Sequence, residues 1–173
     1  DRKDPNPFSA YGGASDQRPL SMVTNDAGEV HVLGICGGSG FPTTPGSLFP
    51  DSIGNWDIVV THLDATGSAL LGSTYLGGSS NDGLGPNDGT LPHWASLYKG
   101  KLEIDSLGNI WSICTTQSPD FPTSPDAVQD TLGGGFDAVI TCMNSDCSTL
   151  LHSTYMGGSF MDQGCDLVLA PGG

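Results

Sequence analysis

Two acid–amide pairs in a glycine-rich stretch are the residues best suited to hold a cation. Asn81–Asp82 and Asn87–Asp88 are separated by glycines and a proline. A calcium ion takes about six to eight oxygen ligands, which carboxylates, amides and carbonyls in such a loop can provide. The spacing fits no EF-hand loop, and a polar turn without a ligand is the competing interpretation. We expect no cofactor, with calcium at Asp82 and Asp88 as the alternative.

The same stretch also carries three ring-bearing side chains, His93, Trp94 and Tyr98. Exposed rings in a loop bind sugars or partner proteins, because their faces are apolar and their polar edges form hydrogen bonds. The alternative, which we favour, is that the rings fold back over the edge of a sheet and become buried. The three residues stand as a candidate binding site on an inserted loop.

One pair among the five cysteines has hairpin spacing. Cys142 and Cys147 flank a four-residue loop, and opposed hairpin positions bring Cβ atoms to about 5 Å, close to disulfide reach. We hypothesise a disulfide between these two residues, with two small buried thiols as the alternative. An odd number of cysteines at this density points only weakly to an oxidising compartment.

No catalytic motif is present in the chain. It lacks a Gly-x-Ser-x-Gly elbow, a His-Glu-x-x-His helix and a phosphate loop, which are the short patterns that place a nucleophile, a metal or a phosphate. The sequence therefore predicts a protein that is not an enzyme.

All of these residues lie within an internal repeat of the sequence. Phe41-Pro-Thr-Thr-Pro returns 80 residues later at Phe121, and four further segments keep the same offset. The Gly-Gly pair at 12–13 lies only 65 residues before the pair at 77–78. The unit is therefore about 65 residues long, and the second copy carries a 15-residue insertion near 84–98. The expected division is a leading segment 1–9, a first unit 10–76, a second unit 77–156 and the start of a third at 157–173.

Each unit contains four candidate strands. In the third strand of the first unit, Trp56, Ile58 and Val60 point one way, and Val59 and Leu63 point the other. Both faces are apolar, so both faces should be covered, as in a propeller blade stacked between two neighbours. We predict an all-β fold of consecutive four-stranded antiparallel blades of an incomplete β-propeller, about two and a half blades. The predicted strands are 19–25, 29–35, 55–63, 68–76, 99–105, 109–115, 135–143, 148–156 and 165–170.

The repeat also bears on the histidines. His31 and His62 lie in predicted strands, where the other unit has Trp111 and Cys142. A catalytic histidine would not tolerate such exchanges, so we interpret both as packing residues. His152 takes the place of a glycine and receives the same interpretation.

Five segments follow one another along the chain: Ser73–Gly83, Asp105–Asn109, Asp120–Pro125, Gly133–Ala138 and Cys147–Leu151. Their order resembles a known repeat family, the bacterial SBBP repeat, or seven-bladed β-propeller repeat. The resemblance spans about residues 10–173 and departs from the family pattern in the insertion and at Ala10–Gly12. It implies a large secreted or surface-anchored protein of the kind found in Bacteroidota, exported by type IX secretion and serving adhesion or gliding motility. It implies no active site.

Three hydroxyl side chains match the O-glycosylation signal of the Bacteroidota proteins that this resemblance implies. Ser52, Ser106 and Thr131 each follow an aspartate and precede an apolar residue. The signal is short, and an aspartate-rich chain also matches it by accident.

The composition restricts the partners. Nineteen acidic residues against five basic ones give a formal net charge of −14, which argues against binding nucleic acid or an anionic membrane. No apolar run approaches the length of a membrane span. The sequence predicts an acidic, non-enzymatic extracellular scaffold or adhesion module, and the alternative is a carbohydrate- or calcium-binding module acting through the 80–100 loop. Its expected partners are other blades of the same or a longer chain, surface polysaccharide and cell-surface proteins.

Overall fold

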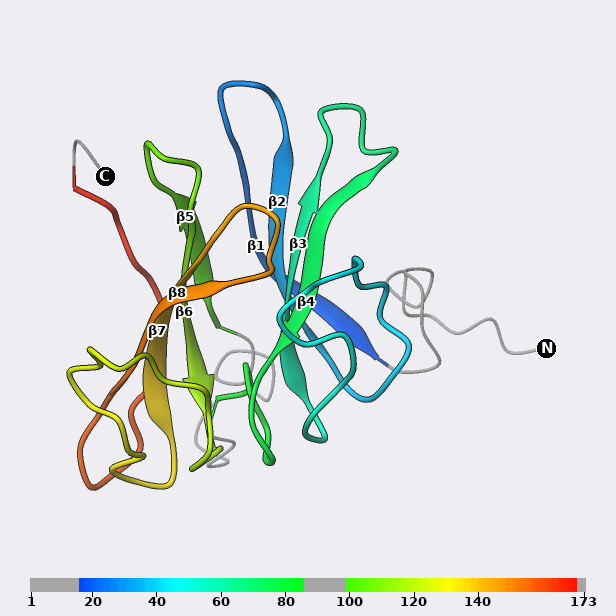
Figure 1. Cartoon of the computed structure of the whole chain (residues 1–173). Coiled ribbons are helices and arrows are strands. Elements are labelled where there is room, and N and C mark those ends of the chain that lie inside the picture. The colour runs from blue at the N-terminus through cyan, green and yellow to red at the C-terminus, as the bar shows by residue number, and fades with distance from the viewer. Residues whose placement is uncertain (1–15, 86–98, 171–173) are drawn as a thin grey trace.

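The computed structural model describes residues 16–85 and 99–170, and this part of the chain contains strands and no helix. The strands form two sheets that lie side by side, with β5 of the second sheet against β1 and β2 of the first (Figure 1). The fold is all-β, as predicted. The strands are β1 (Gln17–Thr24), β2 (Val30–Cys36), β3 (Asp57–Leu63), β4 (Leu70–Leu76), β5 (Lys101–Ile104), β6 (Ile110–Thr116), β7 (Asp137–Met143) and β8 (Leu150–Met156).

Each sheet is an antiparallel meander in which neighbours in sequence are neighbours in space. The orders are β1-β2-β3-β4 and β5-β6-β7-β8. The registers repeat: Ile58 pairs with Leu76, and Ala138 pairs with Met156 at the equivalent position. Both third strands also shift register at their last residue. The internal repeat of the sequence is therefore a repeat of one four-stranded sheet.

Eight of the nine predicted strands are present, with ends displaced by a few residues. The ninth prediction, a strand at 165–170, is wrong: residues 162–170 form no ladder with another strand of the described chain. A strand is defined by its hydrogen-bonded partner, and periodicity in a sequence cannot supply one. β5 is half as long as β1, and it follows the insertion near 84–98.

The main core lies between the two sheets. One face of the first sheet packs on the opposite face of the second, and the most buried members have no exposed surface. Area removed from water at this interface stabilises the pair by about 25 cal/mol per Å² of apolar surface. The first sheet contributes Leu33, Ile58, Val60 and Leu76, and the second contributes Cys114, Phe121, Val139 and Tyr155.

The other face of the first sheet is covered by its own long loop between β2 and β3. Phe41 and Phe49 of this loop pack on Cys36, Val59 and Tyr75. Apolar side chains on both faces of β3 are therefore buried, as the sequence predicted. The cover on this side is a loop of the same unit, and the cover on the other side is the next sheet.

A tyrosine of the last strand ties the long loop to each sheet. The Tyr75 hydroxyl accepts a hydrogen bond from the backbone N–H of Phe41 (2.8 Å) and donates one to the carbonyl of Gly38 (3.3 Å). Tyr155 accepts from Phe121 (3.0 Å) and donates to a carbonyl of its own loop (2.6 Å). Burial raises the pKa of both phenols to about 12, so both stay protonated donors.

Replacing either tyrosine by phenylalanine tests this contact. We expect Tyr75→Phe and Tyr155→Phe each to lower the free energy of unfolding by about 1–3 kcal/mol, because each leaves loop groups without their partner. Urea denaturation followed by circular dichroism measures the loss. If only one of the two variants had a lower free energy of unfolding, the result would contradict the equivalence of the two units.

Candidate functional site

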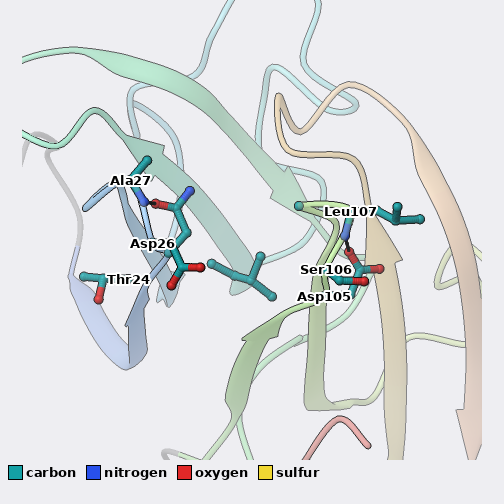
Figure 2. Close-up of a pocket in the computed structure, with 9 residues that line it drawn as sticks. Thr24, Asp26, Ala27, Asp105, Ser106 and Leu107 are labelled. Carbon is teal, nitrogen blue, oxygen red and sulfur yellow. Dashed lines mark hydrogen bonds between the residues drawn. The ribbon is translucent and has the colours of Figure 1, made fainter. Parts of the chain in front are cut away.

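A cleft of about 530 Å³ lies between the β1–β2 turn and the β5–β6 turn, at one end of the paired sheets (Figure 2). The two turns are repeat equivalents, and each closes with a glycine in the left-handed region, Gly28 (φ 79°) and Gly108 (φ 84°). The walls are mainly polar, and Leu107 is 85% exposed at the rim. The carboxylates of Asp26 and Asp105 are among the groups that line this cleft.

The best acceptors at the cleft are used to build the turns. The Asp105 carboxylate accepts from the backbone of Leu107 (2.9 Å) and Asn109 (2.8 Å) and from the indole N–H of Trp111 (3.2 Å). Burial alone would raise the pKa of Asp105, but these hydrogen bonds, with one from the Asn109 side chain, lower it. Asn25 holds the other turn through Ala27. The exposed Asp26 and Ser106 complete a weakly polar surface with no nucleophile beside a base.

Asp82, the predicted calcium ligand, is fully buried in the segment that follows β4, where it forms an isolated bridge with Thr116 at the end of β6. Oδ1 accepts from the Thr116 hydroxyl, and Oδ2 accepts from the Ser118 hydroxyl (2.9 Å) and the Gly78 N–H (2.8 Å). Both oxygens are thus engaged, and a calcium ion at Asp82 would have to displace these donors. The structure gives Asp82 a structural role beside both sheets, which we call the aspartate latch. Its N–H donates to the Trp56 carbonyl just before β3 (2.7 Å), and its carboxylate contacts the end of β6 and the residues just beyond it. Sequence reasoning missed this role.

Backbone hydrogen bonds flank the aspartate latch. The Gly83 N–H donates to the Thr115 carbonyl (2.7 Å), and the Gln117 N–H donates to the Asn81 carbonyl (3.0 Å). Burial raises the pKa of Asp82 to about 6, against the lowering effect of its donors. The three donors oppose the effect of burial, because their hydrogen bonds stabilise the ionised carboxylate.

The first unit has the same contact with weaker chemistry. Gln17 takes the position of Asp82, and its side-chain amide donates to the sulfur of Cys36 (3.7 Å) at the position of Thr116. The backbone pairing persists, because the Gly37 N–H donates to the Asp16 carbonyl (2.9 Å). No motif signals either pair: aligning the two units places Gln17 at the position of Asp82 but does not show the partner of either side chain.

His31 and His62 form a stacked pair, with ring centroids 3.9 Å apart. His62 contacts the Ser145 carbonyl of the second unit through Nδ1 (2.9 Å) and the Glu29 carboxylate through Nε2 (3.1 Å). Neither ring nitrogen of the buried His31 has a partner among the described residues. Burial, then the charge of His62, lowers the pKa of His31 to about 4. Both histidines are packing residues at the interface, as predicted.

A serine, a histidine and an aspartate also meet on the second unit. His152 Nδ1 lies 3.3 Å from both Ser124 Oγ and Asp126 Oδ1, and Ser124 donates directly to Asp126 (2.6 Å). A nucleophilic relay needs the serine and the aspartate on different ring nitrogens. Here both contact the same nitrogen, so the group fixes a loop and activates no hydroxyl.

The two hairpin cysteines are not opposed across their strands. Cys142 pairs with His152, and Cys147 lies in the turn, where its N–H donates to the Asn144 carbonyl (3.0 Å). Both are buried free thiols, and burial raises the pKa of Cys142 to about 11 and that of Cys147 to about 12. The geometric premise of the disulfide prediction is therefore wrong, because the turn places Cys147 beyond the ladder.

The remaining predicted residues divide by location. Ser106 and Thr131 are exposed on loops, and Ser52 is half-buried, so glycosylation of the three stays a prediction. Asp88, His93, Trp94 and Tyr98 lie outside the described residues.

No protein-family model and no curated protein matches this chain. Within residues 16–85 and 99–170, no three His, Cys, Asp or Glu side chains are placed to hold a metal ion. The same part of the chain has no helix that is long and apolar enough to cross a membrane.

The aspartate latch can be tested by substitution. We expect Asp82→Ala to lower the free energy of unfolding by about 3 kcal/mol at pH 7, because three buried donors lose their acceptor. Gln17→Ala is the matched control at the equivalent position and should cost less, since it removes a single weak contact. Urea denaturation measures both, and equal losses would contradict the latch.

The stacked histidines predict a pH dependence. The unfolded chain binds a proton at His31 near pH 6.5, whereas the folded chain resists it to about pH 4. Stability should therefore fall as the pH drops from 6.5 to 4. In His31→Phe this fall should be smaller by on the order of 2 kcal/mol, because phenylalanine stacks but does not titrate. Parallel pH profiles of the two proteins by thermal unfolding would contradict this account.

Proposed function

We propose that this protein is a non-enzymatic β-propeller segment that serves as an extracellular scaffold or adhesion module. One observation carries the proposal: the two repeated sheets stack face to face, and the groups at their interface that could do chemistry are used to hold the sheets together. Stacked repeats gain stability from contacts with neighbouring units and present a broad surface. Such a surface suits a protein that binds partners or acts as a spacer.

The polar clusters support a structural role. Asp82 joins the sheets, Asp105 builds a turn, and His152 with Ser124 fixes a loop. Each carboxylate accepts hydrogen bonds from nearby donors. Asp82, whose pKa is raised most, is buried and has no access to solvent. Catalytic groups need an open position for substrate beside a base, and these clusters offer none.

Charge and resemblance support the location. The net charge of −14 favours solubility and repels nucleic acid and anionic lipid. The resemblance to the SBBP repeat adds the secreted surface proteins of Bacteroidota as the setting. The partners that fit are further blades, surface polysaccharide and other cell-surface proteins.

A deletion separates the scaffold from a loop-borne binding site. We expect the chain lacking 84–98 to keep its fold, because the first unit lacks this insertion and forms the same sheet. Circular dichroism checks the fold, and glycan arrays with calcium titration calorimetry check binding by the full chain, by the deletion and by Asp88→Asn. Asp26→Asn is the matched surface control.

The outcomes of this experiment separate the function classes. Glycan or calcium binding that the deletion abolishes would make the protein a carbohydrate- or calcium-binding module. Hydrolysis of a polysaccharide or peptide that His93→Ala abolishes would overturn the non-enzymatic proposal.

A further inference from the structure

The two turns beside the cleft of Figure 2 share the residues that build a turn and differ in the side chains that they offer to a ligand. Asn25 and Asp105 each accept hydrogen bonds from the backbone N–H groups two and four residues ahead. The other lining side chains differ between the turns: Thr24 against Ile104, Asp26 against Ser106, and Ala27 against Leu107. One repeated turn therefore gives the cleft two unlike walls, and the differing side chains determine what it binds.

The carboxylate of Asp26 is the free acceptor on the first wall. It is exposed, and within residues 16–85 and 99–170 no group donates a hydrogen bond to it or forms an ion pair with it. Figure 2 shows it pointing from its own turn toward the second turn. Asp105 on the second wall already accepts four hydrogen bonds, so it contributes mainly its negative charge. Since none of the described lining residues is basic, the cleft favours a cation that pairs with Asp26.

Ile104 gives the second wall an aliphatic surface. It is half-buried and packs against the core between the sheets, which fixes its position. A long cationic side chain buries its carbon stem on such a surface and keeps its charged head at a polar partner. Arginine fits better than lysine, because its planar guanidinium forms two parallel hydrogen bonds with one carboxylate.

Other classes of ligand fit this cleft less well. A calcium ion takes about six to eight oxygen ligands, and Asp26 brings the one free carboxylate among the described lining residues. Rings that stack on sugars are absent from the same set of residues. The volume of about 530 Å³ lies in the range of ligand pockets, roughly 300–1,000 Å³. The cleft therefore admits an arginine together with the peptide groups on either side of it.

We propose that this cleft binds an arginine side chain from an extended segment of a partner protein. The guanidinium pairs with Asp26, the carbon stem lies on Ile104, and the hydroxyls of Thr24 and Ser106 bond the neighbouring peptide groups. The proposal rests on the proposed function, because it gives the chemistry of one partner of the adhesion module. The net charge of −14 attracts a basic partner to this surface.

The site needs both units, because Asp26 belongs to the turn between β1 and β2 and Ile104 is the last residue of β5. The contact of β5 with β1 and β2 holds the two walls side by side. A ligand that binds only the paired sheets stabilises the pairing by mass action. Binding of the partner and stacking of the two units are therefore coupled.

A short peptide tests the proposal on the full chain. The probe is acetyl-Ala-Arg-Ala-amide, and the matched ligand carries citrulline, which keeps the shape of arginine without its charge. Salt at about 0.15 M largely screens exposed charges that are more than a Debye length apart. Backbone nitrogen-15 chemical shifts follow each titration. We expect shifts confined to residues 24–28 and 104–108, and binding of the citrulline peptide that is weaker by on the order of fivefold.

Substitutions test the two walls. Asp26→Asn should weaken the affinity for the arginine peptide about fivefold, as expected for loss of an exposed ion pair. Its matched control is Asp130→Asn on the loop between β6 and β7, which changes the net charge equally and should leave the affinity unchanged. Ser106→Lys places a competing cation on the second wall and should also weaken binding, whereas Thr131→Lys should not. All four positions are exposed, so circular dichroism should show an intact fold.

Equal losses from Asp26→Asn and Asp130→Asn would indicate diffuse attraction to an acidic surface and would overturn the site. Unchanged affinity in Ser106→Lys would overturn the second wall. A citrulline peptide that binds as tightly as the arginine peptide, or an absence of localised shifts, would overturn the proposed ligand. Equal binding of a lysine peptide would overturn the preference for a guanidinium. The glycan, calcium and turnover assays use other ligands and follow the deletion of 84–98, so failure of the proposed function is distinguishable from failure of this cleft.

Discussion

The need to cover both faces of each sheet is the constraint on which the rest of the structure depends. A four-stranded sheet with apolar side chains on both faces is not stable alone in water, because the apolar surface of both faces stays hydrated. The first sheet solves this with Phe41 and Phe49 of its own loop on one face and the second sheet on the other. The repeat follows from this: a unit with two apolar faces is completed by a neighbour of the same kind.

Polar contacts then determine how the neighbours are aligned. Apolar burial is not directional, so the core alone would tolerate sliding of one sheet over the other. Asp82 limits that freedom, because its N–H donates to the Trp56 carbonyl beside the first sheet and its carboxylate accepts from hydroxyls on β6 and just beyond it. His62 adds a second fixed point at the Ser145 carbonyl. A buried carboxylate costs desolvation free energy, and here it contributes specificity of alignment.

Several residues of types suited to chemistry take part in this packing and hydrogen bonding between the sheets. Histidine, aspartate, serine and cysteine are small or polar side chains that fit between closely packed sheets and satisfy backbone groups there. Where the two units differ, as at His62 and Cys142 or Gly72 and His152, the difference changes packing against the neighbour. Under the proposed function, binding is assigned to surfaces and loops, which carry variation without disturbing the core.

The sequence by itself determined the repeat, the strands and the turns, because these depend on local rules. Alternating apolar residues mark the strands, and Asn25 and Asp105 followed by glycine mark the hairpins. The tertiary structure alone decided that Asp82 meets Thr116, 34 residues away, and that Cys147 lies in a turn away from Cys142. Neither sequence spacing nor residue type encodes which side chains face each other across two sheets. That choice is made by the packing of whole sheets, after every local preference has been satisfied.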